Sequence, residues 1–229
     1  MANTNEKHYS LELEELFLKW RIAQMALDGN EDFLNFSAYV FTPDGLLGKE
    51  EDYCDSHNKK VLYILKESRV KLDEYQPSYF WAKGLINKKL DEVETYEERI
   101  YLHNLQAMQN LLINENEDKQ ADLKFAAYMN VSKNGGFDST PNTKISRYAK
   151  HFRWFIKEQI RILEPDIIVN CCSTISSISK IISDLKVELP EWNLMVINGY
   201  HPGGINGSQK AKYLKQFKEK LFAAQQERK

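Results

Sequence analysis

Residues 145–170, ISRYAKHFRWFIKEQIRILEPDIIVN, contain a helix, a stop signal and a strand in succession. At about 100° per residue, residues 145–163 form a predicted helix with one apolar and one basic side. The apolar side holds Tyr148, Phe152, Phe155, Ile156 and Ile160, and the basic side holds Arg147, Lys150, Arg153, Lys157 and Arg161. Glu164-Pro165 ends this helix, and the apolar run in Asp166–Asn170 predicts a buried strand. The basic side is typical of a solvated surface, and it could follow phosphates only beside a ligand.

Three more short apolar runs predict strands, at Val61–Leu65, Phe125–Met129 and Leu194–Ile197. Helical patterns lie between and around them, at 11–27 with Ser10 as N-cap, within 71–116, at 173–185 and at 208–225. Thr42-Pro43-Asp44-Gly45 has a turn signature. Strands that alternate with helices predict an α/β fold, a three-layer α/β/α sandwich around a central, mostly parallel four-stranded sheet.

Length and composition place the chain among globular intracellular proteins. Its 229 residues suit a single α/β domain, with residues 1–60 as a helical extension packed on it. The net charge of −2 is not that of a polycation, so a nucleic-acid partner would require a local basic patch. Three cysteines, no membrane-length apolar run and a polar N-terminus predict a cytoplasmic protein without a membrane partner. We expect a monomer.

Polar residues follow each of the four predicted strands. In parallel sheets, ligands bind beyond the carboxyl ends of the strands, so these residues form the predicted site. They are Lys66-Glu67-Ser68, Asn130-Val131-Ser132-Lys133, Asn170-Cys171-Cys172-Ser173 and Asn198-Gly199-Tyr200-His201.

Glu67 and Asn130 can both act on a ligand. Glu67 is the single carboxylate of these strand ends and could orient a water molecule, or it could pair with Lys66 or cap the next helix. Asn130 offers a donor and an acceptor that suit a base edge, or it could fix a turn. Lys133, before Asn134-Gly135-Gly136, could meet a phosphate or remain an exposed loop lysine.

His201 lies in the sequence Gly199-Tyr200-His201-Pro202-Gly203-Gly204. Glycine allows close backbone approach to a ligand, and proline restricts the histidine before it. The imidazole could therefore donate to an oxygen that gains charge as a leaving group departs, although a histidine packed in a turn fits the pattern too.

Two other groups of residues invite functional interpretation. Cys171 and Cys172 suggest a nucleophile or a metal ligand, but they lack neighbours at ligand spacing and fit buried structural thiols better. The aromatic cluster Tyr75, Tyr79, Phe80 and Trp81 is typical of a core, or it could stack on bases. Common nucleotide, hydrolase and zinc motifs are absent from the sequence.

The order of these motifs resembles the uracil-DNA glycosylase superfamily, with this chain as a divergent member. The resemblance runs from about Val61 to the C-terminus through Leu65-Lys66-Glu67-Ser68, Tyr128-Met129-Asn130-Val131-Ser132-Lys133, Ile162–Val169 and Tyr200-His201-Pro202. It implies a DNA-repair hydrolase that cleaves the N-glycosidic bond of a base flipped out of DNA. No cofactor and no metal cluster are expected, since the iron-sulfur branch requires four cysteines.

The resemblance also assigns roles to individual residues. Glu67 would assist the attacking water and His201 would stabilise the departing base, while Asn130, Tyr200 and Ser68 would contact the base. The expected nucleic-acid contacts are Lys66, Lys133, Gly203 and Gly204. Two alternatives remain: a binding module without catalysis that uses the same crevice for nucleic acid or a nucleotide, and a hydrolase that uses Cys172 with His201.

Overall fold

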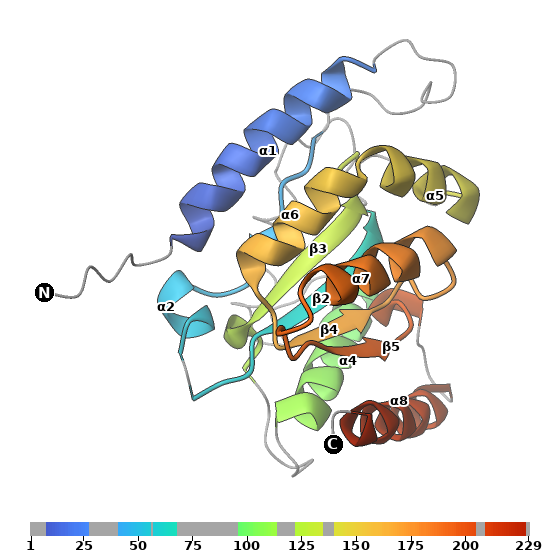
Figure 1. Ribbon diagram of the computed structural model, residues 1–229. Helices are drawn as coiled ribbons and strands as arrows, with labels where there is room; N and C mark the ends of the chain where they lie inside the picture. The colour runs from blue at the N-terminus through green and yellow to red at the C-terminus, as the bar shows by residue number, and fades with distance from the viewer. Residues whose placement is uncertain are drawn as a thin grey trace, which may run out of the picture.

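A mixed β-sheet forms the middle layer of the computed structural model (Figure 1), which describes residues 8–27, 41–55, 57–67, 96–113, 122–134, 140–204 and 209–227. Within these ranges the strands are β1 Gly45–Leu46, β2 Val61–Glu67, β3 Ala126–Ser132, β4 Ile167–Asn170 and β5 Met195–Asn198. Their order across the sheet is β1-β3-β2-β4-β5. Strands β2 to β5 run parallel to their neighbours, and β1 pairs antiparallel with β3.

The predicted number of strands is wrong by one, since the described sheet has five strands and not four. Each apolar run predicted as a strand belongs to one of the parallel strands, but β1 adds an antiparallel edge beside β3. The turn signature of residues 42–45 concealed it, because Gly45 begins β1 with a φ of 145°. The segment expected to be an N-terminal extension thus contributes a strand to the sheet, and Trp20 and Leu46 to the core.

Helices cover both faces of the sheet (Figure 1). One face carries α1 Tyr9–Met25, α5 Asn142–His151, α6 Arg153–Leu163 and α7 Ser176–Glu188. The other carries α4 Tyr96–Ile113 and α8 Gln209–Gln226. Short turns of helix complete the described chain, at α2 Glu50–Tyr53, η3 Leu123–Phe125 and η4 Pro202–Gly204. The described residues therefore form an α/β fold of three layers.

Side-chain alternation along the strands produces the two cores. In β2, Leu62 and Ile64 pack under α1, α5, α6 and α7, whereas Val61, Tyr63 and Leu65 pack under α4 and α8. All five side chains are buried, as expected for a parallel strand covered on both faces.

Two helix predictions are wrong in detail. The predicted helix 145–163 is divided into α5 and α6 at Phe152, whose φ and ψ of −94° and 22° leave the helical region. The Phe152 ring is buried against Tyr148 and Trp20, and this packing fixes the bend. Ser10 does not cap α1, which begins at Tyr9, and the Glu50 carboxylate accepts the first two N–H groups at 2.9 and 3.2 Å.

The connections define where a ligand site is expected. The chain passes from β2 to β3 through α4 on one face, and from β3 to β4 through α5 and α6 on the other. The connections therefore change sides between β2 and β4, which are neighbours in the sheet. Such a switch point is where open α/β sheets bind ligands. The strand ends there carry Lys66 and Glu67 on β2, and Asn170 on β4.

Candidate functional site

Glu67 ends β2 at the switch point and is half-buried. Its Oε1 accepts the N–H of Thr140 at 2.9 Å, just before α5 begins. This bond is neither the ion pair with Lys66 nor the helix cap considered for Glu67; it ties the end of β2 to the segment that leads into α5. No described residue donates a hydrogen bond to Oε2, so that oxygen can hold a water molecule. Lys66 is also half-buried, and Ser68 lies outside the described residues.

Asn130 lies within β3 and is 4% exposed. It pairs in register with Leu65, and Ser132 pairs with Glu67, so Asn130 sits one strand away from Glu67 and deeper in the sheet. Its backbone is held on both sides: its N–H donates to Asp44 Oδ2 at 2.6 Å, and its carbonyl accepts from Lys133 Nζ at 2.9 Å. Among described residues, its side-chain amide has no hydrogen-bond partner.

The side chain of Lys133 is fully buried and therefore does not reach the surface. Its Nζ lies 2.6 Å from Asp44 Oδ1. It also lies 5.3 Å from the ring centroid of Phe17 and 5.0 Å from that of Trp20. Alternation along the chain turns Lys133 toward α1 and α6, away from solvent. The expected phosphate contact is therefore wrong, and Lys133 belongs to a buried ion pair.

Burial shapes the electrostatics of this pair. Desolvation lowers the pKa of Lys133 from 10.5 to about 8, and the attraction of Asp44 opposes that shift. Desolvation likewise raises the pKa of Asp44, against the attraction of Lys133 and the hydrogen bonds from Asn130 and Gln159. Gln159 on α6 donates to Asp44 Oδ1 at 2.7 Å, so three donors converge on one carboxylate.

The basic side of the predicted helix is largely engaged with α7. Arg153 pairs with Asp184 at 2.6 Å, and Lys157 and Arg161 both pair with Glu188. Lys157 is itself buried rather than solvated. These three cations hold α6 against α7, so the α6 part of this side is an interhelical contact, while Arg147 and Lys150 on α5 are exposed.

The cysteines after β4 are structural. Cys171 and Cys172 are buried, and desolvation raises the pKa of the Cys172 thiol to about 12 and that of Cys171 well above its usual value. A thiol that stays protonated at neutral pH is a poor nucleophile. The geometry around them is fixed by backbone bonds, with the Cys171 N–H donating to Ile64 and the Cys172 N–H donating to the Asn170 side chain, both at 3.0 Å.

His201 follows β5 and is half-buried, with its ring 5.9 Å from that of Tyr101 on α4. The N–H of Gly203 donates to His201 Nδ1 at 3.2 Å. Because Nδ1 accepts a hydrogen bond, the neutral ring carries its proton on Nε2. This hydrogen bond fixes the orientation of the imidazole within the turn.

Three helical residues that the sequence analysis did not identify support this turn. Asn104 on α4 donates from Nδ2 to the Pro202 carbonyl at 2.7 Å. The Tyr213 hydroxyl on α8 accepts the Tyr200 N–H at 3.3 Å and also contacts the Tyr200 carbonyl. With Tyr101, they fix the His201 turn from the α4–α8 side. Their sequence signal is weak, since each lies in an otherwise ordinary helical pattern.

The other residues predicted around this turn are placed as follows. Tyr200 is about half exposed, and Lys220 Nζ lies 4.8 Å above its ring while donating to the Asn198 carbonyl at 2.8 Å. A Cβ on Gly203 would lie 3.4 Å from His201 Nδ1, so glycine permits the close turn. Gly204 ends η4. The aromatic cluster at 75–81 lies outside the described residues.

The predicted residues lie near the carboxyl ends of the parallel strands, but at unequal distances from one another. Glu67 and Asn130 come from neighbouring strands, whereas His201 follows β5, two strands from β2. At about 4.8 Å per strand, that separates the backbones of β2 and β5 by about 10 Å. A ligand that touched both Glu67 and His201 would have to lie across the end of β4.

The described residues contain no group of three or more His, Cys, Asp or Glu side chains that could hold a metal ion. None of the described helices has both the length and the apolar character required to span a membrane. Comparisons of the chain with protein-family models, with curated proteins and with solved structures find no match.

Proposed function

We propose that the protein is a glycosylase-like hydrolase that cleaves the N-glycosidic bond of a base in nucleic acid. In this reaction a water molecule attacks C1′ of the sugar, the C1′–N bond breaks, and the base leaves with the bonding electrons. Glu67 Oε2 orients the water and takes up its proton. His201 Nε2–H donates to the base oxygen on which negative charge develops.

One observation carries this proposal more than any other, namely the hydrogen bond from the Gly203 N–H to His201 Nδ1. With Nδ1 as an acceptor, a neutral ring would carry its proton on Nε2. A neutral donor suits a leaving base because it stabilises the departing anion through a hydrogen bond. Glu67 supplies the complementary group, since Thr140 holds Oε1 and leaves Oε2 for water.

Base release from modified oligonucleotides tests the reaction. The purified chain is incubated with single- and double-stranded DNA that contains uracil or another altered base, and the free base is measured. We expect release by the wild type, and loss of release in Glu67→Gln and His201→Ala. Glu67→Gln separates the structural role from the catalytic one. Its amide oxygen can still accept the Thr140 N–H, while the proton acceptor for water is lost.

Matched controls separate chemistry from folding. Glu15→Gln and His57→Ala make the same changes at exposed positions, on α1 and in the segment before β2. Both should leave release unchanged. No release by the wild type from a broad panel of bases, or full release by Glu67→Gln and His201→Ala, would overturn the mechanism.

A second candidate is a binding module that holds nucleic acid or a nucleotide at the same edge without catalysis. The Thr140–Glu67 hydrogen bond favours it, because it gives the carboxylate a purely structural task. This candidate predicts salt-dependent binding with no product. Under it, Glu67→Gln binds as tightly as the wild type, whereas absence of any nucleic-acid or nucleotide binding would exclude both candidates.

A further inference from the structure

The outer side of α1 carries an apolar stripe that the fold does not use. Leu11, Leu18, Ile22 and Met25 are 56%, 62%, 60% and 52% exposed. At about 100° per residue they fall within about 60° of one another around the helix axis. The inner side of the same helix is already buried in the core through Leu13, Leu16, Phe17 and Trp20.

The spacing of the stripe is that of a helix–helix seam. Leu11, Leu18 and Met25 are seven residues apart, and Ile22 lies four residues after Leu18. Intervals of three, four and seven residues place apolar side chains along one line of contact between two helices. Figure 1 shows α1 along the margin of the molecule, with α6 on its inner side, so the stripe lies on an accessible face.

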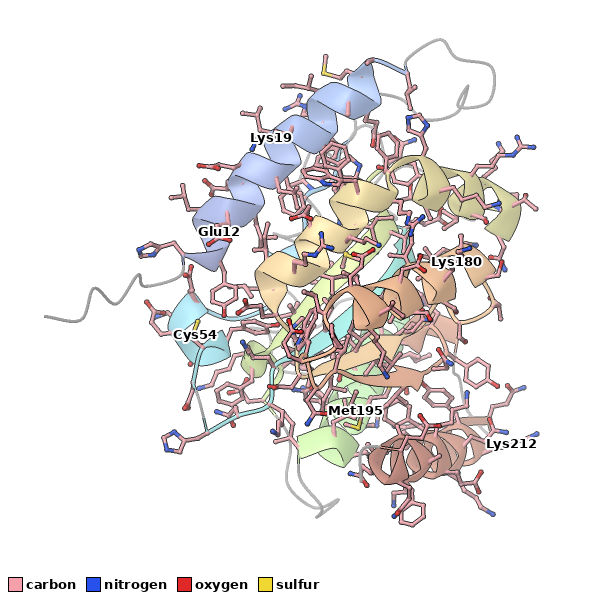
Figure 2. All side chains as sticks on the ribbon, viewed as in Figure 1. Glu12, Lys19, Cys54, Lys180, Met195 and Lys212 are labelled. Atoms are coloured by element: carbon pink, nitrogen blue, oxygen red, sulfur yellow. The ribbon has the colours of Figure 1, made fainter. Side chains whose placement is uncertain are left out.

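Charges beside the stripe are arranged in opposite halves of the helix. Glu14 and Glu15 precede Leu18, and Lys19 and Arg21 follow it. All four side chains are exposed, and none of them forms an ion pair with a described residue. In Figure 2 the labelled Glu12 and Lys19 mark the acidic and basic halves of α1.

We propose that the outer side of α1 is a dimer interface on which a second copy of this chain packs its own α1 antiparallel. A two-fold axis at Leu18 sets Leu11 of one copy against Met25 of the other. Glu14 and Arg21 lie on the same edge of the stripe, so each Glu14 faces Arg21 of the second copy. A parallel pair would instead align like charges, and it would align the helix dipoles as well.

This inference is independent of the proposed function, since α1 covers the face of the sheet opposite to α4 and η4, where the His201 turn packs. It differs from the monomer expected from the sequence. The pattern of residues 11–27 predicts one apolar side, made of Leu13, Leu16, Phe17, Trp20 and Met25, whereas in the structure Met25 lies on the exposed stripe.

Sedimentation velocity of the full chain from about 1 to about 100 μM tests the interface, a range that covers dimers of micromolar affinity. We expect a dimer for the wild type and a monomer for Leu18→Lys, which places two ammonium groups at the axis. Val187→Lys changes an exposed apolar residue on α7 and should stay dimeric. Circular dichroism confirms that each variant is folded.

A charge exchange tests the antiparallel arrangement itself. Glu14→Arg should raise the dimer Kd about tenfold, because two attractive pairs become repulsive. Arg21→Glu should do the same, and the double variant Glu14→Arg/Arg21→Glu should restore the wild-type Kd. A monomeric wild type throughout the range, a dimer that Leu18→Lys leaves intact, or a double variant no tighter than the single ones would overturn the proposal.

Discussion

The buried pair of Lys133 and Asp44 should respond to single substitutions with opposite dependences on pH. Lys133→Met keeps the length of the side chain but leaves the Asp44 carboxylate buried without a cation. Asp44→Asn leaves the Lys133 ammonium without an anion. It also replaces one of the two oxygens that accept hydrogen bonds from Lys133 Nζ, the Asn130 N–H and Gln159 Nε2. Both partners are fully buried, so solvent does not compensate for either loss.

The expected cost is large. Removal of one partner from a buried pair costs about 3–5 kcal/mol of unfolding free energy. At about 2–4 °C per kcal/mol for a chain of this size, the Tm should fall by about 6–20 °C. Asp184→Asn breaks the partly exposed pair with Arg153 and serves as the matched control. It should cost no more than about 1 kcal/mol.

The direction of the pH effect follows from the pKa shifts. Burial raises the pKa of Asp44 above 3.8, and loss of Lys133 raises it further, so the Lys133→Met penalty relative to the wild type grows as the pH rises above the raised wild-type pKa of Asp44 and shrinks on acidification. Burial lowers the pKa of Lys133 from 10.5 to about 8, and loss of Asp44 lowers it further. The folded Asp44→Asn variant then loses the Lys133 proton at a lower pH than the wild type does, so its penalty relative to the wild type shrinks as the pH rises toward about 8.

Urea unfolding at about pH 5, 7 and 9 measures both dependences, read by circular dichroism and tryptophan fluorescence. Trp20, one of four tryptophans in the chain, lies beside the pair, with Lys133 Nζ 5.0 Å from its ring centroid. The reasoning is refuted if the penalties of the two variants change with pH in the same direction, or if both variants cost as little as Asp184→Asn.

Three further substitutions test the fold and the histidine turn. Gly45→Ala should cost more than about 1 kcal/mol in urea unfolding, because Gly45 has a φ of 145° and a Cβ would lie 2.9 Å from Leu13 Cδ1; an unchanged midpoint would contradict this. Glu50→Ala should cost about 0.5–2 kcal/mol and shorten α1 at its start, since the carboxylate accepts the first two N–H groups, and amide hydrogen exchange should show it. Tyr213→Phe should lower base release, whereas Tyr53→Phe, which also removes a buried hydroxyl, should lower stability alone; equal release by both would argue against a role of Tyr213 in the turn.

The sequence predicts the parallel strands well because each is a short apolar run bounded by polar residues and helices. It cannot predict β1, whose two residues are too few to show any period. It also cannot predict the break at Phe152, because the amphipathic pattern continues through it. That break depends on the packing of Phe152 against Trp20, which is distant in the sequence.

The sequence predicts a site residue well when the residues that hold it are close to it in the sequence. The Gly and Pro residues around His201 lie in one turn, and the turn does hold the ring by the Gly203 N–H. Lys133 shows the opposite case. Its partner Asp44 is 89 residues away and lies in a segment with a turn signature, so neither residue alone indicates a buried pair. Asn104 and Tyr213 act from helices whose patterns mark only which side is buried.

The buried pair also bears on the candidate site through Asn130. Asp44 binds the N–H of Asn130 and Lys133 binds its carbonyl, so the two charges fix the backbone on both sides of this residue. By alternation along β3, the Asn130 side chain lies on the face of Tyr128, toward α4 and α8, while Lys133 lies on the opposite face. An ion pair in one core therefore positions an amide on the other face, which is a reason to retain a pair that is costly to bury.

If Asn130 contacts the base, Lys133→Met should raise the KM for base release in the folded protein more than it lowers kcat, because a displaced amide weakens binding without touching the reacting atoms. An unchanged KM in Lys133→Met would show that the pair serves stability alone.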